Sequence, residues 1–196
     1  NLLGTLLLFG VVLNIGIAQR HNEDAIAAQA TLILLVVGSA AGALYGEFGV
    51  AIMIGIGTIM LHGLAIVRDS GNLASMGIAV SYLWVGIHAI SNNWELFGLV
   101  ILPFEDDLLL FLLMVCVTAT NSTMAAKFVE KDNWFSDAFK GLGLGKPGLW
   151  SVSVGLGMIG ALLSVAANRL ETGYALAQLV LLLTAFSASY LVVRGV

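Results

Sequence analysis

Residues 105–127 read EDDLLLFLLMVCVTATNSTMAAK, and this stretch decides the fold. Its apolar run follows three acidic residues and ends at Lys127, where a loop begins that also contains Lys131, Lys140 and Lys146. A helix needs about 20 mostly apolar residues to cross a bilayer. The stretch therefore predicts a membrane-spanning helix whose direction is given by the acids at one end and the lysines at the other.

The composition of the whole chain agrees with a membrane protein. Of its 196 residues 59% are hydrophobic and 10% are charged, and the mean hydropathy is +0.99. A soluble domain carries about 25% charged residues. We expect a single all-α integral membrane domain in the cell (plasma) membrane, with the lipid bilayer as its main partner. The net charge of −4 gives no basis for nucleic-acid binding.

The spacing of the apolar runs predicts a bundle of seven transmembrane helices. The second and third runs are separated only by Tyr45-Gly46-Glu47-Phe48-Gly49, whose two glycines favour a tight reversal. The predicted spans cover residues 2–19, 26–45, 49–67, 72–91, 107–127, 149–168 and 174–193.

The basic residues give these spans a direction. On the seven-span prediction, seven of the eight Lys and Arg residues fall on one side, and only Arg169 falls on the other. Because cytoplasmic loops carry the excess of Lys and Arg, the N-terminus is predicted outside and the C-terminus in the cytoplasm. The acids divide evenly, so the outer face is predicted to be acidic.

Two connecting segments have patterns of their own. Residues 93–105 are too short to cross and are predicted either to lie at the interface or to form a re-entrant loop, with interfacial packing favoured. Residues 128–148 are predicted to be a cytoplasmic loop, in which 132–140 is either a short amphipathic helix with Trp134, Phe135 and Ala138 on its apolar face or an ordinary loop with aromatic anchors.

An internal repeat is permitted by this topology. Leu6-Leu7-Leu8-Phe9 matches Leu108-Leu109-Leu110-Phe111 at the same point of a helix that runs inward. Three helices, a linker helix and three more helices would then form two parallel repeats, as in some transporters. Such leucine-rich tetrapeptides also recur by chance, so the repeat is not established by the sequence.

Reactive groups are sparse within the predicted spans. No Asp, Glu, Lys or Arg needs to lie deep in the membrane, which disfavours proton pumps and ion-coupled carriers with a buried carboxylate. His62 and His88 lie roughly 9 and 24 Å from the inner edge by helical rise, too far apart in depth to share a metal ion. No metal site, cofactor or catalytic constellation is predicted, and an enzyme is the least favoured class.

Depth along the helices suggests one candidate site. Five polar residues from five spans fall roughly 7–11 Å below the cytoplasmic edge. They are Asn14, Gln29, His62, Asn121 and Ser187. We interpret them as a polar layer or inner vestibule. The alternative is that each side chain separately bonds to a neighbouring backbone.

One stretch resembles a known family. Tyr82-Leu83-Trp84-Val85-Gly86-Ile87, followed by Trp94 and Phe97, is similar to a segment of the amide and urea channel family, over about sixteen residues. That family runs this helix from outside to inside, opposite to the direction predicted here, so no functional residue is transferred from it.

Two functions remain open from the sequence. The first is a channel or transporter for a small, uncharged solute. The second is a non-catalytic structural subunit of a larger membrane complex, for which glycine-rich helix faces are equally natural. Either a homo-oligomer or other membrane subunits would be the protein partners.

Overall fold

The fold is described by a computed structural model over residues 24–96, 99–145, 147–167 and 170–194, and within 24–44 only the side chains of Gln29 and Ile33 are described. The predicted span at 2–19 lies outside these residues. The described elements are α2 (Asp24–Arg68), α3 (Gly71–Ile90), β1 (Trp94–Leu96), β2 (Leu99–Ile101), α4 (Asp107–Lys127), α5 (Trp134–Gly141), α6 (Leu149–Ala166) and α7 (Thr172–Arg194).

Five of the described helical segments are long and apolar enough to cross a membrane. They are Tyr45–Arg68 within α2, and the helices α3, α4, α6 and α7. Each overlaps one of the predicted spans, and α4 has the predicted limits. Over its described residues the chain is thus all-helical apart from one β-hairpin, with the segments expected of an integral membrane protein.

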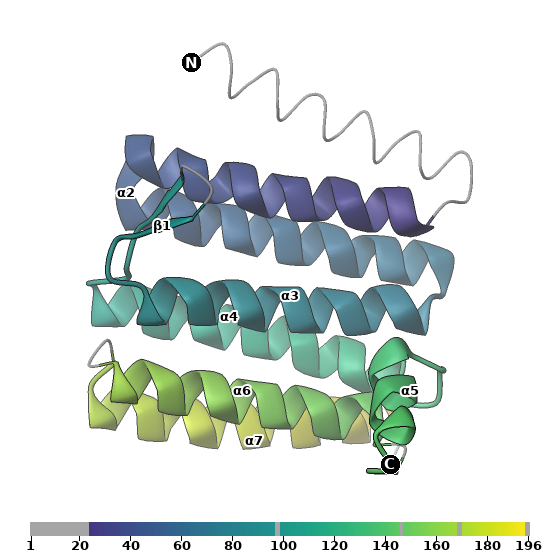
Figure 1. Cartoon of the computed structure of the whole chain (residues 1–196). Helices are drawn as coiled ribbons and strands as arrows, with labels where there is room; N and C mark the ends of the chain where they lie inside the picture. The colour runs from purple at the N-terminus through teal and green to yellow at the C-terminus, as the bar shows by residue number, and fades with distance from the viewer. Residues whose placement is uncertain (1–23, 97–98, 146, 168–169, 195–196) are drawn as a thin grey trace.

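The reversal predicted at residues 45–49 is present within α2. Gly46 has φ 64° and ψ −164°, which is not a helical conformation. This backbone region is essentially restricted to glycine. Figure 1 shows the two halves of α2 folded back against each other around this point. One glycine therefore converts an apolar segment that is too long for the bilayer into a helical hairpin.

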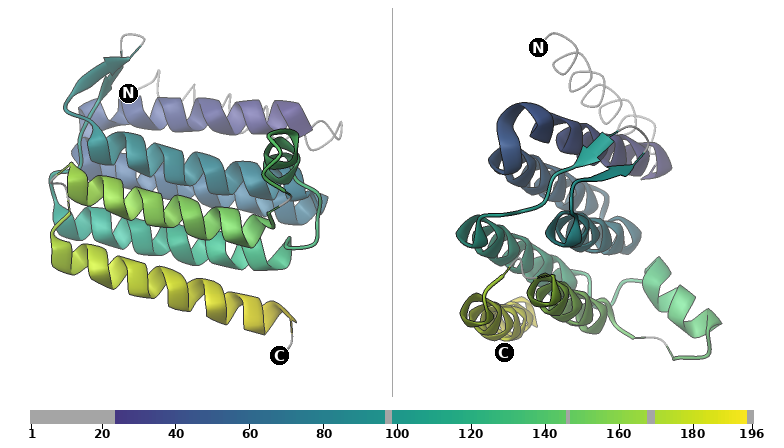
Figure 2. Two further views of the ribbon diagram at one scale, coloured as in Figure 1. Left: turned by 60° about the horizontal axis from the view of Figure 1, so that its bottom comes forward. Right: turned by 60° about the vertical axis from the view of Figure 1, so that its left-hand side comes forward.

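The helix α4 is the centre of the described bundle. It contacts α2, α3, α6 and α7, and its buried face combines apolar residues such as Leu110 and Val117 with small or polar ones such as Thr118, Asn121 and Ala125. Figure 2 shows the long helices running side by side, with α7 at one flank of the bundle. Polar groups on α4 are consequently enclosed by its neighbours.

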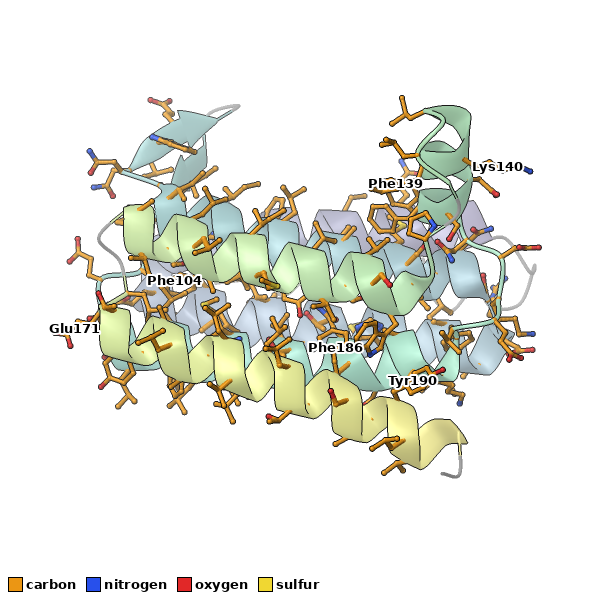
Figure 3. The ribbon with its side chains drawn as sticks, turned by 90° about the horizontal axis from the view of Figure 1, so that it is seen from below. Phe104, Phe139, Lys140, Glu171, Phe186 and Tyr190 are labelled. Carbon is orange, nitrogen blue, oxygen red and sulfur yellow. The ribbon has the colours of Figure 1, made fainter. Side chains whose placement is uncertain are left out.

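The two ends of the bundle are fixed by different contacts. At one end Asp69 pairs with Lys131 at 2.6 Å, and the Asn72 side chain accepts a hydrogen bond from the Trp134 backbone. At the other end the Glu47 carboxylate accepts hydrogen bonds from the backbone N–H groups of Glu105 and Asp106. Lys140 and Glu171 accordingly lie at opposite ends of the molecule (Figure 3).

The segment between α3 and α4 is a β-hairpin. Trp94 pairs with Ile101 and Leu96 with Leu99 in antiparallel register. This pairing satisfies some of the backbone hydrogen-bonding groups of the two strands. The sequence predicted an interfacial or re-entrant segment here, but it did not predict a hairpin. His88 Nδ1 donates to the Leu102 carbonyl at 2.7 Å, and Ser91 Oγ donates to the Ile101 carbonyl. The hairpin is thereby attached to the end of α3.

The short helix predicted within 132–140 corresponds to α5. Asn133 is its N-cap and accepts a hydrogen bond from the Ser136 backbone. Trp134 and Ala138 are exposed, as predicted for the apolar face, whereas Phe135 is half-buried and packs against the core. The ring of Trp134 stacks on Phe135, so the aromatic pair joins α5 to the end of the bundle.

Candidate functional site

Buried polar side chains from four helices meet inside the bundle. We call them the polar seam, and they are His62 on α2, Ser81 and Tyr82 on α3, Thr118 and Asn121 on α4, and Gln178 on α7. All six are buried, and Asn121 and Gln178 are 0% exposed. Thr118 and Asn121 are three residues apart and therefore lie on one face of α4.

Asn121 joins three helices through its amide group. Its Oδ1 lies 2.8 Å from His62 Nε2, and its Nδ2 donates to Ser81 Oγ at 3.0 Å. Ser81 Oγ in turn donates to the Ile78 carbonyl on its own helix. This network connects α2, α3 and α4 where the surroundings are otherwise apolar.

The Asn121 amide is oriented with Nδ2 toward the Ser81 hydroxyl, while Oδ1 lies 2.8 Å from His62 Nε2 and 3.3 Å from Ser81 Oγ. In this orientation His62 Nε2 carries the proton that Oδ1 accepts. His62 Nδ1 is then a bare acceptor, and it has no hydrogen-bond partner among the described residues. This edge of the ring packs against Gly77, where an added Cβ would lie 2.8 Å from Cε1 and 2.9 Å from Nδ1.

A second network forms around Gln178. Its Nε2 donates to Thr118 Oγ1 at 2.8 Å and to the Met114 carbonyl at 3.4 Å. Its Oε1 has no partner in the part of the chain that the structure describes. The amide nitrogen of Gln178 thus donates to α4, while its amide oxygen remains an acceptor inside the bundle.

Tyr82 lies between the two networks. Its hydroxyl is close enough to interact electrostatically with both Thr118 and Asn121, but it forms no hydrogen bond of normal geometry within the described ranges. The hydroxyl packs against Gly157 of α6, where an added Cβ would lie 3.0 Å from the oxygen and closer still to Leu182. The absence of a side chain on Gly157 therefore makes room for Tyr82.

The structure brings together two of the five residues of the predicted polar layer, His62 and Asn121. Gln29 and Ser187 are exposed on the described surface, and Asn14 lies outside the described residues. The remaining members of the seam were missed by reasoning from depth alone. Thr118 and Gln178 are polar residues within apolar spans, and this property was the available signal.

The seam contains no ionisable group other than His62 and Tyr82. The buried polar residues of the described chain include no Asp, Glu, Lys or Arg. In the same residues there is no group of three His, Cys, Asp or Glu side chains that could hold a metal ion. The chemistry that the seam offers is hydrogen bonding by neutral groups.

Comparison with known proteins gives no family for this chain. No family model, no curated protein and no solved structure matches it.

Proposed function

We propose that the protein is a channel or transporter for a small, uncharged, polar solute, and that the polar seam contacts this solute. The observation that carries the proposal is the set of three buried polar atoms without a hydrogen-bond partner among the described residues: His62 Nδ1, Tyr82 Oη and Gln178 Oε1. An unsatisfied buried polar group costs about 1–3 kcal/mol. Water or a polar solute within the bundle would supply the missing hydrogen bonds.

The position of the seam supports a role in permeation. Along α4 it extends from the Met114 carbonyl to Asn121, which is about 10 Å by helical rise. From Met114 to Asp107 is another 10 Å or so, and from Asn121 to Lys127 about 9 Å. The seam therefore occupies the middle third of a hydrocarbon core about 30 Å thick, where a solute most needs hydrogen bonds.

The proposal includes the topology predicted from the sequence. Seven spans, with the N-terminus outside and the C-terminus in the cytoplasm of the cell, place Glu47, Glu95 and Glu171 on the outer side. The end of the bundle that contains Arg68, Lys127 and Lys131 is then cytoplasmic, as the positive-inside rule favours. The difference in charge between the two ends would direct membrane insertion, and it would not affect the movement of neutral solutes.

Solute flux into proteoliposomes tests the proposed function. Purified protein in phosphatidylcholine vesicles is exposed to gradients of glycerol or urea, and swelling is followed by stopped-flow light scattering. We expect flux above that of protein-free vesicles. Tyr82→Phe removes a hydroxyl that makes no hydrogen bond of normal geometry with the described residues, so we expect the fold to be retained while flux falls by about two- to tenfold.

Tyr45→Phe is the matched control for this variant. Tyr45 is 67% exposed and lies in the turn of α2, so the same chemical change there is expected to leave flux unchanged. Wild-type vesicles that behave like protein-free vesicles for every neutral solute would contradict the proposed function.

A structural subunit of a membrane complex remains the second candidate. The observation that favours it is the apolar outer surface of α7, where Leu176, Val180 and Leu183 are exposed. Such a surface fits a neighbouring protein helix as well as lipid. Constant co-purification of another chain with α7 buried against it, combined with no solute flux, would favour this alternative.

A further inference from the structure

The polar-seam atoms that lack a hydrogen-bond partner among the described residues differ in whether they can donate or accept a hydrogen bond. In the orientation that the Asn121 amide has in the structure, His62 Nε2 carries the ring proton and Nδ1 is an acceptor. Gln178 Oε1 is an acceptor because a carbonyl oxygen cannot donate. Only the Tyr82 hydroxyl can both donate and accept. Free acceptors therefore outnumber free donors at the seam.

From this imbalance we propose that the seam selects small neutral solutes rich in O–H or N–H donors, and rejects solutes of similar size that can only accept hydrogen bonds. The inference rests on the proposed function and specifies the substrate class of the same site. A polyol can donate to both acceptors and still accept from Tyr82. A solute without donors leaves His62 Nδ1 and Gln178 Oε1 unpaired.

The packing around His62 and Gln178 holds both side chains in orientations in which His62 Nδ1 and Gln178 Oε1 find no donor nearby among the described residues. The Gln178 amide nitrogen donates to Thr118 Oγ1 and to the Met114 carbonyl on α4. Rotation of the amide would place Oε1 against the Met114 carbonyl, which cannot donate, so the observed orientation is favoured. The His62 ring is held by Asn121 on one edge and packs against Gly77 near the other. The preference for donors is therefore built into the packing of four helices.

The size of the preference follows from the number of unpaired acceptors. Each buried acceptor left without a partner lowers the stability of the bound solute, and sites that hydrogen-bond a substrate hydroxyl or amine strongly reject analogues that lack it. We expect the flux of a donor-rich solute to exceed that of an acceptor-only solute by about tenfold or more.

Two solutes of comparable size test this inference. Glycerol carries three hydroxyl donors, whereas trimethylamine N-oxide is neutral overall, accepts strongly and has no donor. Flux of each into proteoliposomes of the full chain is measured as described for the proposed function. Erythritol, which is larger than both and carries four hydroxyls, controls for size: the inference predicts that it permeates faster than trimethylamine N-oxide.

A variant locates the preference at the seam. Gln178→Met keeps a similar side-chain length but removes the free acceptor, and it should reduce the ratio of glycerol to trimethylamine N-oxide flux by about threefold or more. Gln29→Met makes the same change on the exposed surface and should leave the ratio unchanged. A Gln178→Met ratio equal to that of wild type would overturn the assignment.

The outcomes separate this inference from the proposed function. Equal fluxes of glycerol and trimethylamine N-oxide, both well above protein-free vesicles, would overturn the donor preference and leave the proposed function standing. Flux no higher than in protein-free vesicles for glycerol, trimethylamine N-oxide, erythritol and urea alike would overturn both. Fast glycerol and erythritol flux with slow trimethylamine N-oxide flux would support both.

Discussion

Asn121 connects α2, α3 and α4 through a single amide group. His62 contacts its carbonyl oxygen and Ser81 contacts both its nitrogen and its oxygen, so the position requires a neutral donor and acceptor on one short side chain. Leucine would fill the space and leave His62 Nε2 without its acceptor. Aspartate would keep the acceptor and place a charge in the interior of the membrane, which is costly.

Replacing Asn121 by leucine should destabilise the protein by about 1–3 kcal/mol, because His62 and Ser81 lose buried hydrogen bonds. Unfolding in mixed micelles of detergent and dodecyl sulfate, followed by circular dichroism, measures this change. Gln29→Leu makes a comparable change on the exposed surface and should stay within about 0.5 kcal/mol of wild type. Equal stabilities of the two variants would show that the network contributes nothing to folding.

For single residues, the depth of a side chain along its helix could be derived from the sequence. The direction in which the side chain faces could not. The fixed rise of a helix placed His62 and Asn121 at one level, and the structure joins them at 2.8 Å. The same arithmetic included Gln29 and Ser187, which are exposed on the described surface. Which face of each helix turns inward depends on the neighbours it packs against, and these are not encoded in spacing along the chain.

At the scale of elements, Gly46 carries the reversal of α2. Nothing lies within 4 Å of an added Cβ at this position, yet its φ of 64° with ψ of −164° is a conformation that other residues avoid. Gly46→Ala should therefore destabilise the protein by about 1–3 kcal/mol through the backbone alone.

Gly55 is the control for this substitution. It lies within the helical part of α2, and an added Cβ there also meets nothing within 4 Å. Gly55→Ala should be neutral or stabilise by about 0.5–1 kcal/mol, because alanine favours helix more than glycine does. The same denaturation measurement compares the two variants, and a Gly46→Ala protein as stable as Gly55→Ala would contradict a strained turn.

The helices were predictable as elements because apolar length is a strong signal, and the limits of α4 agree with the prediction. The β-hairpin was missed because strands of three residues leave almost no periodic pattern. The connection gave little signal either, because Phe97-Gly98 is not one of the Asn-Gly or Asp-Gly pairs that mark a hairpin in a sequence.

At the scale of the whole molecule, the arrangement of the helices had no counterpart in the sequence pattern. The contacts of α4 with four other helices are set by the shapes of many side chains together. Gly157 illustrates this dependence, because its importance appears only once Tyr82 of α3 and Leu182 of α7 are seen to pack against it. Charge distribution, in contrast, is visible in the sequence and reappears as the difference between the two ends of the bundle.

The proposed direction of insertion rests on that difference and can be tested directly. Single cysteines are introduced at Asp137 in α5 and at Glu171 before α7, both exposed, in a Cys116→Ser background. A membrane-impermeant maleimide should label Glu171→Cys in intact cells and Asp137→Cys only after permeabilisation, because basic loops are retained in the cytoplasm. The reverse pattern would invert the topology. Labelling of both in intact cells would show that the chain between them, which contains α6, does not cross the membrane.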